Sequence, residues 1–160
     1  MPDLTDMDQD LLRRAIDVAR RSRAHGNHPF GAVLADETGQ VLLEVENTVL
    51  TTRDATGHAE TNLIRLASAR WPQATLSQCT LYTSTEPCPM CAGAIFWAGV
   101  GRVVYGLSEQ ELYALGGEGS DGLLLPCREV FGHGGHAVQV LGPALEAEAR
   151  EVHVGFWTPA

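Results

Sequence analysis

Hydrophobic residues recur with helical spacing in two stretches of the chain. In residues 10–24 they are Leu11, Leu12, Ala15, Ile16, Val18 and Ala19, and in residues 58–70 they are Leu63, Ile64, Leu66 and Ala67. Such spacing predicts amphipathic helices that each place one face on a core. Asp8 or Asp10 would cap the first helix, and Trp71-Pro72 would end the second.

Shorter hydrophobic runs predict strands. Residues 31–35 and 41–45 flank turn-forming residues 36–39, which predicts a hairpin. Further strands are expected at residues 79–84, 102–105 and 137–141, and further helices at residues 88–97, 108–114 and 143–150. Residues 48–57 and the glycine-rich residues 116–122 are predicted loops, and residues 121–131 show no clear pattern. This order predicts one domain over residues 1–160, with a three-layer α/β/α fold around a mixed five-stranded sheet.

The chain is acidic. Eleven Lys and Arg residues oppose twenty Asp and Glu residues, for a net charge of −9. A surface of this sign repels polyanions, so neither nucleic acid nor an anionic membrane is expected as a partner. No hydrophobic run approaches the ~20 residues of a membrane span, and the acidic N-terminus lacks signal-peptide features. We therefore expect a cytoplasmic protein, in which the four cysteines favour metal binding over disulfides.

Two short motifs predict a zinc site. Cys88 and Cys91 lie three positions apart at a predicted helix start, which places both sulfur atoms on one face of the first turn. The helix N-terminus favours their thiolate forms. His58 lies at the start of the preceding predicted helix. If the two helix starts adjoin, one zinc ion per chain gains three ligands and keeps a fourth position open, which is typical of catalytic zinc.

Glu60 follows the histidine by two residues and is the candidate proton carrier. A water at the open zinc position would ionise near neutral pH. Glu60 could take its proton and pass it to a substrate ring nitrogen and then to a leaving amine.

Two other interpretations of the cysteine pair stay open. A Cys-x-x-Cys pair can be redox-active, although the nearby His-Ala-Glu and the proline before Cys88 argue against that role. A structural zinc site would need a fourth protein ligand. The candidates for that ligand are Cys79, Cys127, His133 and His136.

The two motifs stand within longer matching segments, namely residues 28–33 (HPFGAV), 54–60 (DATGHAE), 83–97 (TSTEPCPMCAGAIFW) and 101–106 (GRVVYG), together with Asn47. These segments resemble the cytidine deaminase superfamily, whose zinc deaminases carry His-x-Glu followed by Pro-Cys-x-x-Cys. Within it, they resemble the branch of free-base and tRNA adenosine deaminases, and look most like bacterial guanine deaminase. The resemblance implies a cytidine-deaminase-like fold.

The resemblance also implies roles around the metal. Asn47 would hydrogen-bond the substrate ring, Phe30 would line or stack on it, and the backbone of Ala59 would contact its edge. Each has an alternative, because an asparagine at a strand end often caps a turn and a phenylalanine often packs in the core. Members of the branch usually form homodimers, so a homodimer is expected, with Phe96 and Trp97 as candidate interface residues.

Residues 107–160 depart from the proteins that the motifs resemble. In free-base deaminases the C-terminal segment closes the pocket, which makes Phe156 and Trp157 the aromatic candidates for substrate contact. Candidate polar contacts are Glu109, Glu111, Glu118 and Asp121. The alternative is that the tail packs on the surface of the domain.

Together these features predict a zinc-dependent hydrolytic deaminase of a free nucleobase or small nucleoside. Guanine, converted to xanthine and ammonia, is the first expected substrate, and cytosine or another aminopyrimidine or aminopurine is the second. A tRNA adenosine deaminase comes third, since the net charge and the segment after residue 106 argue against it. The alternative from another class is a non-catalytic, zinc-stabilised binding domain with a closed four-ligand site.

Overall fold

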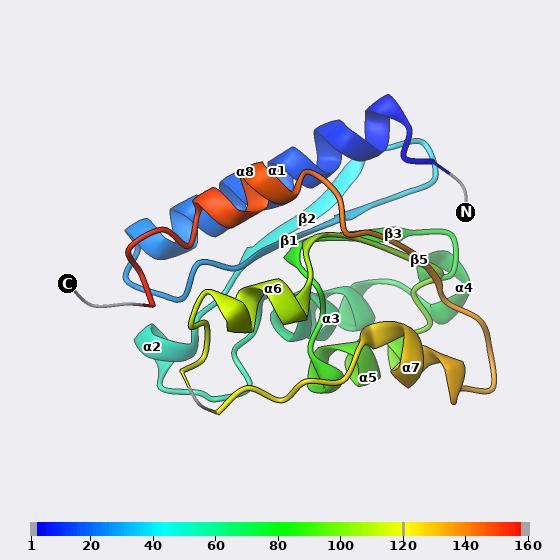
Figure 1. The fold of residues 1–160 in the computed structure, drawn as a ribbon. Coiled ribbons are helices and arrows are strands. Elements are labelled where there is room, and N and C mark those ends of the chain that lie inside the picture. The colour runs from blue at the N-terminus through cyan, green and yellow to red at the C-terminus, as the bar shows by residue number, and fades with distance from the viewer. Residues whose placement is uncertain (1–2, 120, 158–160) are drawn as a thin grey trace.

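A five-stranded sheet forms the centre of the molecule (Figure 1). The computed structural model describes residues 3–119 and 121–157. The strands are β1 (Gly31–Ala35), β2 (Val41–Glu46), β3 (Thr80–Thr85), β4 (Arg102–Leu107) and β5 (Gln139–Leu141), in the order β2-β1-β3-β4-β5. β1 is antiparallel to β2 and to β3, whereas β3, β4 and β5 run parallel. The predicted hairpin and mixed sheet are therefore confirmed.

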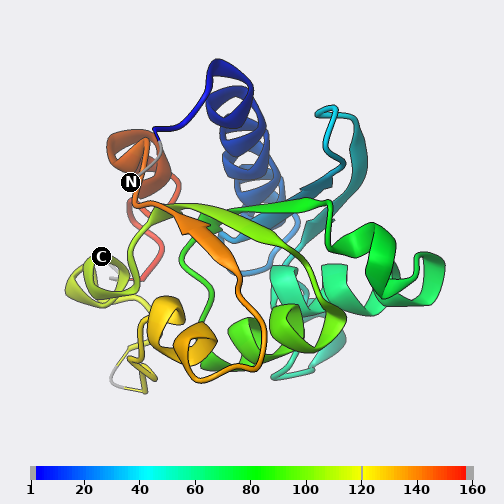
Figure 2. The same ribbon diagram turned by 90° about the vertical axis from the view of Figure 1, so that its right-hand side faces the viewer.

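Helices cover both faces of the sheet, so the fold has three layers (Figures 1 and 2). One face carries α1 (Asp6–Ala24) and α8 (Glu146–Glu151), and the other carries α3 (Ala59–Arg70), α5 (Pro89–Ala98) and α7 (Cys127–Gly132). The remaining helices are α2 (Val49–Thr52), α4 (Gln73–Leu76) and α6 (Glu109–Ala114). The predicted α/β class and three-layer α/β/α arrangement are confirmed.

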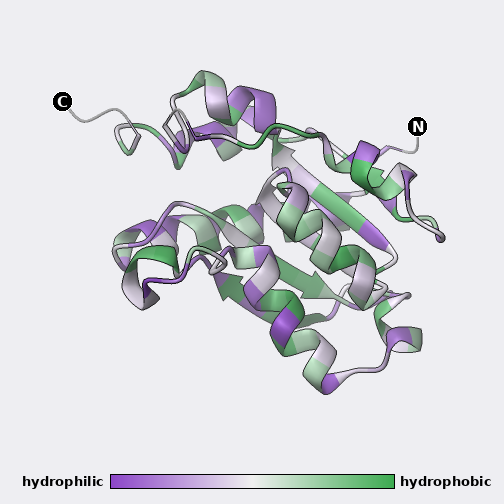
Figure 3. Cartoon of the chain, turned by 90° about the horizontal axis from the view of Figure 1, so that it is seen from below, coloured by the Kyte–Doolittle hydropathy of each residue, from purple (hydrophilic) through white to green (hydrophobic). Residues whose placement is uncertain are grey.

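The sheet separates two hydrophobic clusters. The first lies between the sheet and α3, α5 and α7, and the second lies between the sheet and α1 and α8. Because both faces are covered, every residue of β1 and β3 is buried. Viewed from below, the strands are largely hydrophobic, while the helices in front of them mix hydrophobic and hydrophilic residues (Figure 3).

The first helix begins earlier than predicted. α1 starts at Asp6, with Thr5 as its N-cap, so neither Asp8 nor Asp10 is the cap. The Asp8 backbone N–H donates to Thr5 Oγ1 at 3.0 Å, and the Thr5 N–H donates to Asp8 Oδ2 at 3.1 Å. This reciprocal capping box satisfies two backbone donors and places the helix start before the hydrophobic repeat.

The other differences lie in short elements. The predicted loop at residues 48–57 contains α2, and residues 121–131, for which no element was predicted, contain α7. The short helix α4 after Pro72 was not predicted. β5 is shorter than predicted because it pairs only with residues 102–104 of β4. α8 begins at Glu146, because Leu145 before it has a left-handed backbone. Elements of this length have too few residues for a hydrophobic period to be seen.

Gly31 lets α1 lie directly on β1. A Cβ atom at this position would be 2.5 Å from the backbone nitrogen of Ala19 and 2.6 Å from the carbonyl oxygen of Ala15. Both are main-chain atoms of α1, so they cannot move aside without moving the helix. The absence of a side chain at Gly31 therefore sets how closely the helix approaches the sheet.

A buried ion pair ties α1 to the centre of the sheet. Asp8 is 1% exposed, and its two carboxylate oxygens accept hydrogen bonds from the Arg102 guanidinium of β4, both at 2.8 Å. The Tyr82 hydroxyl of β3 donates to the same carboxylate at 2.7 Å. These hydrogen bonds satisfy a charge that would otherwise be costly to bury.

Replacing Asp8 by asparagine should lower the free energy of unfolding by about 3 kcal/mol, because it leaves the Arg102 charge without its partner. Chemical denaturation at pH 7 measures the change. The matched control is Asp10→Asn, whose side chain is 80% exposed and 3.8 Å from Arg13. This surface change should shift stability by less than ~0.5 kcal/mol. Equal losses in the two variants would contradict the assignment.

The same pair gives a dependence on pH. Hydrogen bonds from Arg102 hold the pKa of the Asp8 carboxyl well below its usual range. A group with a depressed pKa stabilises the fold above its unfolded-state pKa of ~3.9 and loses this contribution as the pH falls. The stabilities of the wild type and Asp8→Asn should therefore converge progressively below about pH 4.

Candidate active site

The starts of α3 and α5 bring the predicted zinc ligands together. His58 is the N-cap residue of α3 and Cys88 that of α5, while Cys91 lies in the first turn of α5. The Sγ atoms of Cys88 and Cys91 each lie 3.5 Å from Nδ1 of His58. All three candidate ligand atoms lie within 4.8 Å of one another.

This donor set fits zinc in both chemistry and spacing. Zinc prefers sulfur and nitrogen ligands in tetrahedral geometry. With Zn–S bonds of about 2.3 Å and Zn–N bonds of about 2.0 Å, tetrahedral angles place sulfur and nitrogen about 3.5 Å apart. The observed separations of 3.5 Å match that value.

The residues considered as a fourth ligand lie elsewhere. Over residues 3–119 and 121–157, His58, Cys88 and Cys91 are the only grouping of three or more His, Cys, Asp or Glu side chains that could hold a metal. Cys79 donates its thiol to the Thr75 carbonyl at 3.4 Å, and His136 stacks on Phe96 with ring centroids 4.1 Å apart. Three protein ligands leave a coordination position open, as in catalytic zinc sites.

Local contacts prepare Cys88 for metal binding. Hydrogen bonds with the Cys91 thiol and the His58 imidazole lower the pKa of the Cys88 thiol to about 4. The thiolate needed as a ligand is therefore available at neutral pH. Cys91 is fully buried, and its Sγ lies 3.2 Å from the Thr61 hydroxyl, which orients it from outside the ligand set.

Glu60 lies in the first turn of α3, where it is 6% exposed and lines a cavity beside His58 and Cys88. Burial raises the pKa of its carboxyl to about 7. A carboxyl with a pKa near the working pH can both accept and return a proton. The structure thus places this carboxyl beside the metal ligands, while its catalytic role stays a prediction.

The cavity has a volume of about 270 Å³. Phe30 is in its wall, as the sequence resemblance implied, and so are Leu112 and Tyr113 of α6. Of the polar candidates, Glu109, Glu118 and Asp121 line the cavity, whereas Glu111 forms a salt bridge with Arg150 at 3.1 Å. The sequence motifs do not indicate Leu112 and Tyr113, because nothing in the sequence of a short predicted helix shows that the helix lies beside the zinc motifs.

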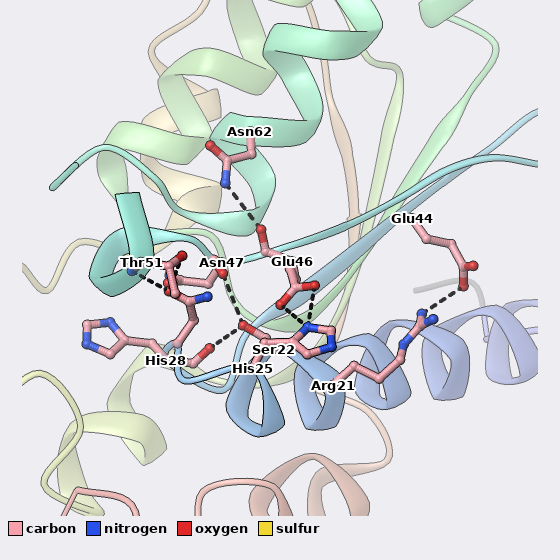
Figure 4. Close-up of polar contacts among 10 residues, drawn as sticks. Arg21, Ser22, His25, His28, Glu44, Glu46, Asn47, Thr51 and Asn62 are labelled. Atoms are coloured by element: carbon pink, nitrogen blue, oxygen red, sulfur yellow. Dashed lines mark hydrogen bonds and ion pairs between the residues drawn. The ribbon is translucent and has the colours of Figure 1, made fainter. Parts of the chain in front are cut away.

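Asn47 is buried directly after β2, within a polar network (Figure 4). Its Oδ1 accepts from the Val49 backbone N–H at 3.0 Å, and its carbonyl accepts from the Ser22 hydroxyl at 3.2 Å. Asn47 thus caps the turn into α2, the alternative noted from sequence. Neither it nor Ala59 is among the described residues that line the cavity, so their contact with substrate stays a prediction.

The C-terminal aromatic residues pack against the cavity wall from behind. The Trp157 ring lies 5.9 Å from that of Phe30 and 5.2 Å from that of His28, and Phe156 lies 5.8 Å from His28. The Trp157 indole N–H donates to Nδ1 of His153 at 3.0 Å. Neither Phe156 nor Trp157 is among the described residues that line the cavity. Their direct contact with substrate remains a prediction.

The sequence matches the family model for the cytidine and deoxycytidylate deaminase zinc-binding region over residues 5–107. The chain belongs to this deaminase family. It is 41% identical to a probable cytosine deaminase of Schizosaccharomyces pombe over 157 residues, which cover 97% of this chain and 95% of the relative. It is 43% identical to guanine deaminase of Bacillus subtilis over 98 residues, which cover 61% of this chain and 62% of that protein.

A solved structure described as guanine deaminase from Nitrosomonas europaea is also similar. It has a TM-score of 0.74 and 25% identity, with 95% of this chain and 87% of that chain covered. Family membership and the donor geometry together show a zinc-dependent nucleobase deaminase that binds zinc through His58, Cys88 and Cys91. The interpretation as a non-catalytic zinc domain was therefore wrong.

Two of the predictions concern the surroundings of the protein, namely a membrane and a second copy of the chain. No helix in the described part of the chain is long and hydrophobic enough to cross a membrane. On α5, Phe96 is partly buried against the core while Trp97 is 81% exposed, so the adjacent rings face different surroundings. The homodimer stays a prediction.

Replacing Cys88 or Cys91 by serine should remove most of the bound zinc, because a neutral hydroxyl is a poor substitute for a thiolate ligand. Metal analysis of the purified proteins measures the ratio, which should be one zinc per chain in the wild type. Cys79→Ser is the matched control, since its hydroxyl can still donate to Thr75 and it lies outside the ligand group. Full zinc content in both site variants would refute the ligand assignment.

Proposed function

We propose that this deaminase converts cytosine and water to uracil and ammonia. The supporting observation is the extent of the similarity to the probable cytosine deaminase, which covers 97% of the chain. That alignment therefore spans α6 and the following loop, which supply Leu112, Tyr113 and Leu123 to the cavity wall. The similarity to the Bacillus subtilis guanine deaminase covers only 61% of the chain. Cytosine thus replaces guanine as the first candidate.

In the proposed reaction, residues of the chain bind the base and move protons. Zinc, when bound, lowers the pKa of a coordinated water toward ~7. The Glu60 carboxylate accepts a proton from the attacking water and delivers it to the ring nitrogen N3. A second proton passes through the same carboxyl to the amine at C4, which leaves as ammonia. The C4–N bond breaks and a C4–O bond forms, so the atoms balance.

Other residues hold the ring during these transfers. Oδ1 of Asn47 accepts a hydrogen bond from the Val49 backbone N–H. Among the contacts of the described residues, Nδ2 of Asn47 donates to no protein group, so its two hydrogens can bind a ligand. In this proposal they bind an acceptor on the base. The Phe30 ring supplies an apolar wall, and the packing of Trp157 on it keeps that ring in place.

Glu60→Gln should reduce kcat by about 10²- to 10⁴-fold, because an amide cannot shuttle protons. Zinc content should be unchanged, since Glu60 is not among the metal ligands. The control is Glu111→Gln, on the protein surface in a salt bridge with Arg150, which should leave kcat nearly unchanged. Full activity of Glu60→Gln would show that another group carries the proton.

Ammonia release should separate the candidate substrates. The panel comprises cytosine, guanine, adenine, their nucleosides and a tRNA anticodon hairpin, and we expect the highest kcat/KM for cytosine. Guanine is the second candidate, because the Nitrosomonas europaea guanine deaminase structure matches 95% of this chain. Preference for guanine would overturn the cytosine proposal and keep the reaction class.

A further inference from the structure

Glu109 is a second buried carboxyl group in the cavity wall, and the proton transfers proposed above do not use it. It is the first residue of α6 and is 2% exposed. It lines the same cavity as Glu60 and the ligands His58 and Cys88. Buried carboxyl groups are uncommon unless a partner compensates them, so the contacts of Glu109 need an explanation.

Those contacts leave much of the carboxyl group free. Oε2 accepts from the Leu125 backbone N–H at 3.3 Å, and Oε1 accepts from the Tyr113 hydroxyl at 3.5 Å. Both distances exceed the usual ranges, which are about 2.7–3.2 Å for N–H···O and about 2.5–3.0 Å for O–H···O, and a carboxyl group has roughly four lone-pair sites. The Tyr113 hydroxyl is also hydrogen-bonded to the backbone of Leu123, so Glu109 shares this hydroxyl with another partner.

The adjacent Glu86 is held in a different way. Its Oε1 accepts from the Glu109 backbone N–H and its Oε2 from the Cys127 backbone N–H, both at 3.0 Å. Both of these hydrogen bonds are shorter than the two that Glu109 accepts, at 3.3 and 3.5 Å, so the carboxylate of Glu86 is held more firmly. The comparison indicates that Glu86 joins the starts of α6 and α7, whereas the side chain of Glu109 is available to the cavity.

The surroundings of Glu109 favour its neutral form. Its ionisable neighbours are Glu86 and Cys88 from the β3–α5 connection, Tyr113 from its own helix and Cys127 behind Glu86. None of the salt bridges among the described residues includes Glu109. Burial, and next the negative charge of Glu86, raises the pKa of Glu109 to about 8. This shift favours the carboxylic acid, with one O–H donor and one carbonyl acceptor, over the carboxylate.

We propose that Glu109 is a specificity-determining residue, which binds a ring N–H and the adjacent C=O of the substrate base. The carboxylic acid O–H donates to the ring carbonyl, and its carbonyl oxygen accepts from the ring N–H. In cytosine these groups are N1–H and C2=O, on the ring edge away from the reacting amine. This inference rests on the proposed nucleobase reaction and adds the group that selects oxo-bases.

The closing experiment pairs a change in the protein with a change in the substrate. Cytosine and 4-aminopyrimidine both carry the amine, but 4-aminopyrimidine lacks the ring N–H and C=O. The wild type should prefer cytosine, and Glu109→Leu should reduce that preference in kcat/KM by about 10- to 100-fold, mainly through a higher KM for cytosine. A purely structural role would lower kcat/KM equally for both substrates and would overturn the inference.

Glu109→Gln keeps the test decisive if the leucine variant does not fold, as checked by its melting temperature and zinc content. Glutamine also offers one donor group and one acceptor without a charge. It should therefore keep most of the preference for cytosine. Loss of the preference in Glu109→Gln would show that the charged carboxylate is the active form and would overturn the inference.

The outcome for the wild type separates this inference from the proposed function. Activity on guanine without activity on cytosine would overturn the cytosine proposal alone. The same comparison would then use guanine and 2-aminopurine, which lacks the N1–H and C6=O of guanine. Turnover of none of these bases would overturn both proposals. Glu111→Gln, on the same helix but outside the cavity, should behave as the wild type on every substrate.

Discussion

The meeting of two helix starts is the constraint on which the active site depends. His58 and Cys88 are 30 residues apart in sequence, yet Nδ1 and Sγ lie 3.5 Å apart because α3 and α5 pack on the same face of the sheet. The helices α3 and α5 also contact each other, and the neighbouring strands β1 and β3 supply buried residues to the hydrophobic cluster beneath them. A zinc ion bound there also joins the two helices, so metal binding and the local fold stabilise each other.

The buried carboxyl groups show how the fold separates structure from chemistry. Asp8 is surrounded by the Arg102 guanidinium and the Tyr82 hydroxyl, and Glu86 by two backbone N–H groups, so both are satisfied within the protein. Glu60 and Glu109 are buried as well, but they line the cavity, and burial raises the pKa of each to about neutral or above. Perturbed groups of this kind concentrate where a protein binds or transforms a ligand.

Most of the long elements could be predicted from sequence, because a buried face leaves a repeating hydrophobic pattern. The predicted helix at residues 58–70 and the predicted strand at residues 31–35 agree closely with α3 and β1. The predictions failed at α2, α4 and α7, whose four to six residues are too few for a period to be recognised. The start of α1 was misplaced because the capping box lies before the hydrophobic repeat.

The sequence by itself predicted zinc and the ligands His58, Cys88 and Cys91, because these residue types are chemically specific and their spacing restricts where they can lie. It also placed Glu60 close to His58, since only Ala59 separates the two residues. Only the tertiary structure decided what surrounds them. α6 brings Glu109 and Tyr113 into the cavity wall, and the C-terminal tail packs Trp157 behind Phe30. These contacts join segments far apart in the chain, and local spacing carries no information about such distances.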